Sequence, residues 1–227
     1  MKNTVLALTS ATLFGFAATA HAAPEFFVGA EAGYQNIDME AGLSYSNNSY
    51  QYGASEDYSM SGVSGGIFAG MKFNVNSSFY LAPEVNFGTS NAKGGVSDSG
   101  SDISGYSYSE SYELEAGTSY GLGLLAGFNV TEATSIYGRL GYQRTNFELT
   151  ESSFDSFSGS ESFSGDEDLN GVRYGVGIET ALTPVVALRL DWSQTQYSDY
   201  SYTTEFDEKA TLDPTESQFQ VGVSYRF

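Results

Sequence analysis

A strict two-residue alternation constrains this chain more than any other feature of its sequence. The last nine residues, FQVGVSYRF, carry bulky apolar side chains at every second position: Phe219, Val221, Val223, Tyr225 and Phe227. Successive side chains of a strand point to opposite faces, so this pattern predicts a strand with one apolar face. The alternation recurs in seven earlier segments: 28–34, 67–75, 79–87, 120–130, 136–142, 172–178 and 188–192. The sequence therefore predicts eight strands and an all-β fold.

The connections between these strands alternate between short and long. Three or four residues (76–78, 131–134 and 183–185) join the second strand to the third, the fourth to the fifth and the sixth to the seventh. The other connections are far longer. An antiparallel up-and-down barrel gathers such long connections at one end. Pro83 is an irregular residue in this pattern, because proline removes a donor from the strand ladder.

Charge decides which face of the barrel is inside. One face of the predicted strands is almost wholly apolar, with Arg144 near a strand end as the exception, and the other face carries four acids and five bases. These nine residues are Glu31, Lys72, Glu84, Arg139, Arg173, Glu179, Arg189, Asp191 and Arg226. A soluble barrel buries its apolar face, whereas a barrel in lipid turns that face outward. We therefore expect an eight-stranded antiparallel up-and-down transmembrane β-barrel with a charged lumen.

The lumen charges allow two interpretations. Eight strands leave an interior just wide enough for side chains, so nearly balanced charges favour a structural ion network. The alternative is a narrow pathway for ions or small solutes, which would be porin-like transport. A wide aqueous pore is excluded because such pores need about sixteen strands.

The first 22 residues have the features of a signal peptide. Lys2 supplies a positive charge, residues 5–18 an apolar core, and Ala20-His21-Ala22 a cleavage site with small residues. We expect residues 23–227 to form the mature barrel domain, with four long extracellular loops. His21 is the single histidine and the chain has no cysteine. The mature part therefore lacks the side chains for Ser-His-Asp or Cys-His catalysis and for His or Cys metal ligation, and we expect no enzyme activity and no cofactor.

Three internal stretches and the C-terminus carry a resemblance to a known family. The stretches "FYLAPEVNFG", "SIYGRLGYQ" and "GVRYGVGIETALTPVVALRLDWSQTQY" are similar to strands of the small eight-stranded outer-membrane barrels, of the outer-membrane protein A and X type. The resemblance implies an outer-membrane location, contact with lipid and lipopolysaccharide, and a C-terminal signal read by the barrel-assembly machinery. Tyr225 and Phe227 occupy the positions of that signal. Because residues 23–227 are assigned to the barrel, we do not expect the peptidoglycan anchoring of some members to carry over.

The four long connections are strongly acidic. Residues 38–60, 90–118, 148–168 and 199–216 hold 22 of the 28 acids, against Lys93 and Lys209. Such a surface repels nucleic acid and should collect divalent cations weakly and collectively, although the solubility of exposed loops alone could explain the acids. The stretch DEDLNG, residues 166–171, matches half of a calcium loop, but Gly177 stands where a glutamate is needed, which argues against an EF-hand. Loop acids such as Asp155 and Asp207 have no base placed beside them for hydrolysis.

The same connections are rich in serine, glycine and aromatic residues. Tyr106, Tyr108, Tyr112 and Leu114 lie two or four residues apart, which predicts that strands continue beyond the membrane as hairpins. The aromatic residues could pair across these hairpins, or a Tyr/Ser surface could bind a ligand as antibody loops do. We therefore expect a non-enzymatic outer-membrane protein that serves surface interaction, adhesion or envelope structure.

Overall fold

The computed structural model describes residues 23–46, 51–101, 103, 106–157, 159–198, 200–203 and 209–227. In these ranges, no helix is long and apolar enough to cross a membrane. The described chain forms one antiparallel sheet of ten strands. The strands are β1 (Glu25–Ser46), β2 (Gln51–Asn74), β3 (Phe79–Ser90), β4 (Lys93–Ser101), β5 (Ser107–Asn129), β6 (Thr134–Asp155), β7 (Gly159–Ala181), β8 (Val186–Tyr197), β9 (Tyr200–Thr203) and β10 (Lys209–Arg226).

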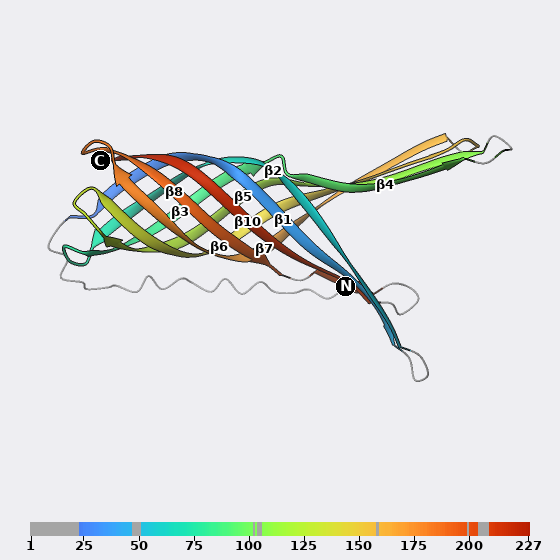
Figure 1. Ribbon diagram of the computed structural model, residues 1–227, viewed down its shortest axis with the longest axis horizontal. Coiled ribbons are helices and arrows are strands. Elements are labelled where there is room, and N and C mark those ends of the chain that lie inside the picture. Colours follow the sequence, from blue (N-terminus) through green and yellow to red (C-terminus); the bar gives the residue numbers. More distant parts are fainter. Residues whose placement is uncertain are drawn as a thin grey trace, which may run out of the picture.

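Eight of the ten strands close into a barrel (Figure 1). Their order is β1-β10-β8-β7-β6-β5-β3-β2, and β2 pairs again with β1. This ring confirms the predicted eight-stranded antiparallel up-and-down barrel. The two additional strands lie in long connections, where β4 pairs with β5 and β9 pairs with β10.

Burial alternates along the barrel strands as the sequence predicts. On β1, Phe27 and Gln35 are buried, whereas Phe26 and Tyr34 are more than half exposed. The exposed side chains form the apolar outer face, and the buried ones line the lumen. Because adjacent residues of a strand point to opposite faces, the orientation of one side chain fixes the orientation of all the others in that strand.

Aromatic side chains mark both ends of the apolar outer face. On three strands, two outward aromatic residues lie eight positions apart and enclose smaller apolar residues. A segment of nine residues matches the length of a transmembrane β-strand, and aromatic girdles are typical of both membrane interfaces. The three pairs are Phe26 and Tyr34, Phe79 and Phe87, and Tyr120 and Phe128.

The three short turns share one pattern of side-chain to backbone hydrogen bonds. Asn76, Thr131 and Thr183 each accept hydrogen bonds through a side-chain oxygen from the backbone N–H groups two and three residues further on, over distances of 2.8–3.3 Å. These Asx and ST turns replace the ladder bonds that end there. The C-terminus lies at the same end of the barrel (Figure 1). We call this the turn end and the opposite one the loop end.

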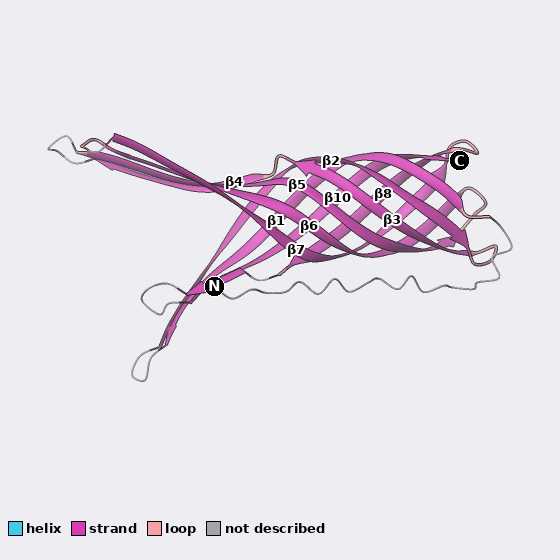
Figure 2. Cartoon of the chain, turned by 180° about the vertical axis from the view of Figure 1, so that it is seen from behind, coloured by secondary structure: helices cyan, strands magenta, loops and turns pink. Residues whose placement is uncertain are grey.

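At the loop end, a four-stranded sheet projects from the barrel (Figure 2). This sheet, here called the arm, consists of β4 and of residues 107–116 of β5, 147–155 of β6 and 159–167 of β7. A register shift between Ala116 and Ser119 lies where β5 enters the arm. Such bulges bend a strand and increase its twist. The arm confirms that strands continue as hairpins beyond the apolar band.

Candidate functional site: a filled lumen and a projecting arm

Four charged side chains form a buried ion cluster in the lumen, here called the central ion cluster. Glu84 of β3 lies 3.0 Å from Arg139 of β6 and 2.7 Å from Arg189 of β8. Asp191, also on β8, lies 3.3 Å from Arg139 and 3.6 Å from Arg189. No more than 5% of any of these side chains is exposed. Two positive and two negative charges thus compensate one another in a space with little water, as a buried ion pair requires.

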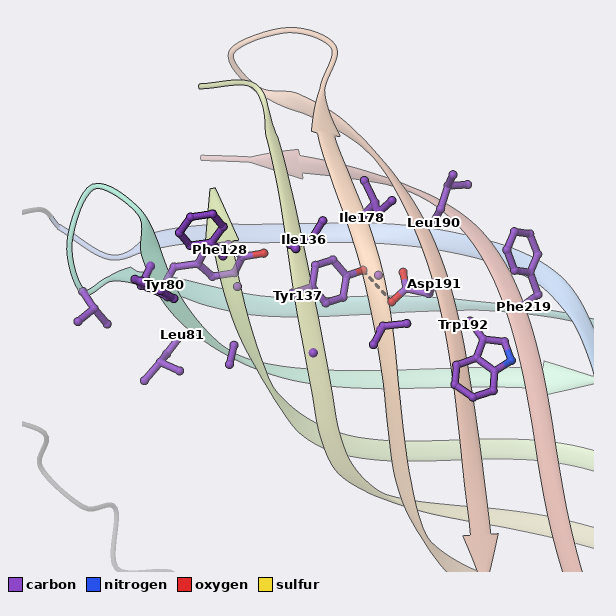
Figure 3. Close-up of a pocket in the computed structure, with 17 residues that line it drawn as sticks. Tyr80, Leu81, Phe128, Ile136, Tyr137, Ile178, Leu190, Asp191, Trp192 and Phe219 are labelled. Carbon is purple, nitrogen blue, oxygen red and sulfur yellow. Dashed lines mark hydrogen bonds between the residues drawn. The ribbon is translucent and has the colours of Figure 1, made fainter. Parts of the chain in front are cut away.

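Aromatic rings complete the surroundings of Arg189. Its Nε donates a hydrogen bond of 3.1 Å to the hydroxyl of Tyr137, which in turn donates one of 2.7 Å to Asp191 (Figure 3). The guanidinium carbon lies 4.2 Å from the centroid of the Phe68 ring, within the range of a cation–π interaction. Trp192, next along β8, points away from Asp191 to the outer face. One strand therefore supplies both the ionic interior and the apolar exterior.

A second ion cluster lies at the turn end of the lumen. Glu179 is 3.5 Å from Lys72 and 2.6 Å from Arg226, and Arg226 is 3.3 Å from Glu25. The ammonium of Lys72 also lies 3.9 Å from the centroid of the Tyr80 ring. These charged side chains are 12–33% exposed, so water screens them more than the first cluster. Glu25 is not among the predicted lumen charges, although it sits opposite Lys72 on the neighbouring strand.

Arg173 differs from the other lumen bases because neutral groups hold it. Its guanidinium donates four hydrogen bonds of 2.7–3.1 Å. Arg173 and the half-buried Glu31 line a polar cavity of about 20 Å³, room for about one water molecule. Seven of the nine predicted lumen charges therefore form ion pairs, and Arg173 is satisfied by amides and a hydroxyl. The four acceptors are Gln143, Ser193, Gln218 and Gln220.

An apolar cluster covers the loop end of the lumen. Beneath it, the hydroxyl of Tyr197 donates a hydrogen bond of 2.5 Å to Glu216 and lies 2.8 Å from Thr145. Glu216 is 2% exposed, so the structure corrects its assignment to the acidic loops and places it inside the barrel. Ionic, polar and apolar layers thus fill the lumen between its two ends. The apolar cluster, here called the cap, consists of Ile37, Met39, Met60, Ala92, Ala116, Phe147 and Tyr197.

The arm has one face on which aromatic rings and carboxylates alternate. The hydroxyls of Tyr106, Tyr108 and Tyr112 each donate a hydrogen bond of 3.2–3.3 Å to a carboxylate on another strand or turn. The negative charges of Asp98 and Glu151 raise the pKa of Tyr108 and Tyr112, respectively, because they disfavour a second negative charge nearby. This aromatic–carboxylate face consists of Val96, Asp98, Tyr106, Tyr108, Glu110, Tyr112, Glu151, Asp155, Glu161 and Phe163.

The opposite face of the arm is dominated by hydroxyl groups. Lys93 lies on this side, where Glu113 and Glu115 hold it at 3.2 and 2.7 Å. The strand register sets the hydroxyl side chains in rows across the four strands. This hydroxyl face includes Ser97, Ser99, Ser109, Ser111, Thr150, Ser152, Ser160, Ser162 and Ser164.

The half-matching calcium loop is not a loop in the structure. Residues 166–171 belong to β7 and pair regularly with β6, and Asp168 accepts hydrogen bonds from Arg144 at 2.8 Å and Asn146 at 3.1 Å. Within the described ranges, no three metal-ligating side chains gather at one point. Asp155 accepts a hydrogen bond from the hydroxyl of Tyr106, and Asp207 lies outside the described residues. Arg144, the charged residue on the otherwise apolar face, therefore has an exposed ion-pair partner in Asp168.

The two C-terminal aromatic residues lie together on the outer surface at the turn end. The ring centroids of Tyr225 and Phe227 are 5.1 Å apart, and both side chains are exposed, Phe227 by 74%. The N–H of Phe227 donates a 2.9 Å hydrogen bond to the carbonyl of Phe26. Both rings therefore belong to the lipid-facing aromatic set, and their role as an assembly signal stays a prediction.

A family model described as the outer membrane protein beta-barrel domain matches residues 6–227. The chain belongs to this family. This outer-membrane barrel is therefore located in the outer membrane, and its apolar outer face contacts lipid. No curated protein sequence matches it.

Several solved barrels are similar in fold to this outer-membrane barrel. Ail, the attachment invasion locus protein of Yersinia pestis, solved with the heparin analogue sucrose octasulfate, is 15% identical, with 87% of this chain and 99% of that chain covered and a TM-score of 0.32. Neisserial surface protein A is 16% identical, with coverages of 89% and 97% and a TM-score of 0.43. The outer membrane protease OmpT of Escherichia coli is 8% identical, with coverages of 88% and 97% and a TM-score of 0.48.

Proposed function

We propose that this outer-membrane barrel is a non-enzymatic surface protein whose loop end faces the cell exterior and whose arm contacts ligands there, in adhesion or in envelope structure. The arm is the observation that carries the proposal. It is a regular sheet that extends beyond the apolar band and exposes large side chains, with Phe163 exposed by 67%. Exposed apolar side chains on rigid projecting elements are typical of interaction sites.

The filled lumen supports the role of a scaffold. A narrow pathway for ions or solutes, the alternative function, would require the central ion cluster and the apolar cap to move apart. Arg189 and Glu84 are 2% and 3% exposed, and Ile37 of the cap is fully buried. Separating the buried charges would cost several kcal/mol.

Shortening the arm should abolish adherence that depends on this protein. Joining Glu148 to Asp166, which are opposite each other in the β6–β7 hairpin, through an Asn-Gly turn removes the outer part of that hairpin and keeps the barrel. Cells that carry this variant should adhere to protein-coated surfaces no better than cells without the protein. The matched control joins Gly42 to Ser55, which are opposite each other in the β1–β2 hairpin, and should adhere like wild type.

Two results would contradict the adhesion proposal. Wild-type adherence by the arm-shortened variant would exclude the arm as the contact surface. Equal adherence of cells with and without the full protein would leave envelope structure as the function of the barrel.

The acids at the loop end should also collect divalent cations, which could bridge them to anionic lipopolysaccharide. Asp213, Glu40 and Asp57 lie side by side on β10, β1 and β2, and with Asp38 they line a depression of about 500 Å³. Like charges in opposite positions repel one another, and exposed charges are screened over about 8–10 Å at physiological salt. Cation uptake should therefore be weak, collective and sensitive to salt.

Calorimetric titration of calcium into the refolded barrel would test this prediction. Wild type should take up calcium at low salt, a variant with the seven acids of residues 148–168 changed to amides should take up less, and single substitutions should have small effects. The absence of uptake, or its loss through one substitution, would contradict a diffuse acidic surface.

A further inference from the structure

On the aromatic–carboxylate face, carboxylates lie between rows of rings. Residues of one face are two positions apart along a strand, so adjacent rows are separated by about 7 Å. Each carboxylate of the middle row therefore lies within reach of an aromatic ring in a neighbouring row. The register gives three rows: Val96, Tyr112, Glu151 and Phe163; then Asp98, Glu110, Ser153 and Glu161; then Gly100, Tyr108, Asp155 and Gly159.

The charge of this face is not balanced within the arm. Its five carboxylates belong to Asp98, Glu110, Glu151, Asp155 and Glu161, and Asp98 stands directly opposite Glu110. Like charges at such positions destabilise a sheet, so a cation bound there would relieve repulsion. The sequence of the arm contains a single base, Lys93, which lies on the hydroxyl face and is held by two glutamates.

The rings determine which kind of cation fits. A guanidinium group can bind a carboxylate through two hydrogen bonds and stack on an aromatic ring at the same time, whereas a hydrated metal ion uses the carboxylates alone. Tyr112 and Phe163 expose 40% and 67% of their surface beside Glu151, which separates them in the row. The face therefore combines both partners that a guanidinium group requires.

We infer that the aromatic–carboxylate face binds an arginine-rich, extended segment of a partner protein. This inference rests on the proposed function and names the chemistry of the partner. In an extended segment, every second side chain points to the same side and repeats at about 7 Å, which equals the spacing of the rows. Arginine at alternate positions can thus reach successive carboxylates while its side chains lie on the rings between them.

Binding of fluorescein-labelled nona-arginine to the full-length barrel, refolded in zwitterionic micelles, tests the inference. Wild type should bind this peptide at about 0.02 M salt and lose most of the binding at about 0.5 M, because exposed charges are screened. Glu110→Gln with Glu161→Gln should weaken binding by at least about tenfold. The matched control, Glu148→Gln with Asp166→Asn, removes two acids from the other face and should weaken binding by less than about twofold.

A second pair of variants tests the rings. Phe163→Ser should weaken nona-arginine more than nona-lysine, since stacking favours guanidinium. Phe154→Ser, on the hydroxyl face, should affect neither peptide. Absence of binding, equal losses from both pairs of acid substitutions, or equal effects of the two phenylalanine substitutions would overturn the inference. If the Glu110 and Glu161 variant fails to bind the peptide but adheres like wild type, the inference fails as the basis of adhesion while the proposed function stands.

Discussion

Arg189→Ala should lower the free energy of unfolding by about 3–5 kcal/mol, because the substitution leaves Arg139 to balance the two buried carboxylates of Glu84 and Asp191. Arg189 is the most enclosed base of the central cluster and bonds to Glu84, Asp191 and the hydroxyl of Tyr137. Alanine also removes the cation–π contact with Phe68. The measurement is the urea dependence of unfolding in micelles, followed by electrophoretic mobility without heating and by Trp192 fluorescence.

Two further variants identify the cause of this loss. Arg144→Ala removes the same side chain from an ion pair with Asp168 that is about 40% exposed, and should leave the urea midpoint unchanged. Replacing Glu84 and Arg189 together with leucine should recover much of the stability, because an apolar pair needs no counter-charge. An Arg189→Ala barrel as stable as wild type would instead indicate a hydrated lumen and would favour the pathway function.

Phe227→Asp, or deletion of Phe227, should abolish insertion into the outer membrane. The substitution places a charge on the lipid-facing surface beside Tyr225 and removes the terminal aromatic that the family resemblance identifies as an assembly signal. A charge on that face is costly in lipid, although less so near the interface. The amount of folded, heat-modifiable barrel in the outer membrane measures the effect.

Two controls separate assembly from a general loss of aromatic surface. Phe227→Tyr should insert normally, since it retains the ring. Phe157→Asp changes an exposed phenylalanine at the opposite end of the molecule and should also insert normally. Normal amounts of folded Phe227→Asp protein in the membrane would show that the C-terminal aromatic is not the signal.

The barrel could be predicted from sequence because membrane and lumen impose opposite polarities on alternate residues. The outward residues of FQVGVSYRF are exposed, four of them on β10 and Phe227 directly after it, and the nine predicted lumen charges lie on the inner sides of their strands. Pro83, the irregular residue, still pairs with Leu124 of β5, whereas the register between β2 and β3 is interrupted beside it. One missing donor is therefore tolerated in a strand that has two neighbours.

The cap and the arm could not be predicted in the same way. Beyond the membrane the inner face becomes apolar, at Ile37 and Phe147 for example, so the polarity rule that identifies the lumen reverses. Glu216 looks like a loop acid because the donor that holds it, the hydroxyl of Tyr197, comes from another strand. Which acids share a face of the arm depends on the bulge near Ala116, which shifts the alternation of β5.

Two inward-facing glycines also indicate where large aromatic side chains lie in the lumen. A Cβ atom on Gly177 would overlap the ring of Tyr137, and one on Gly127 would overlap the ring of Tyr80. These glycines therefore make room for the aromatic side chains that contact Arg189 and Lys72. The two-residue alternation predicts that both glycines face inward. The strand pairing then identifies the ring that each one leaves room for, since Gly177 lies opposite Tyr137 and Gly127 lies opposite Tyr80.

A closed barrel that holds the arm at the cell surface should not conduct ions, and conductance across planar bilayers measures this closure. The refolded wild-type barrel should give no current steps above those of a protein-free bilayer, because ion pairs and the cap fill the lumen. Inserted protein must be verified by its resistance to protease within the same membranes. Stable conductance steps from wild type, in membranes that contain the verified barrel, would contradict the closed scaffold and support a pathway through the lumen.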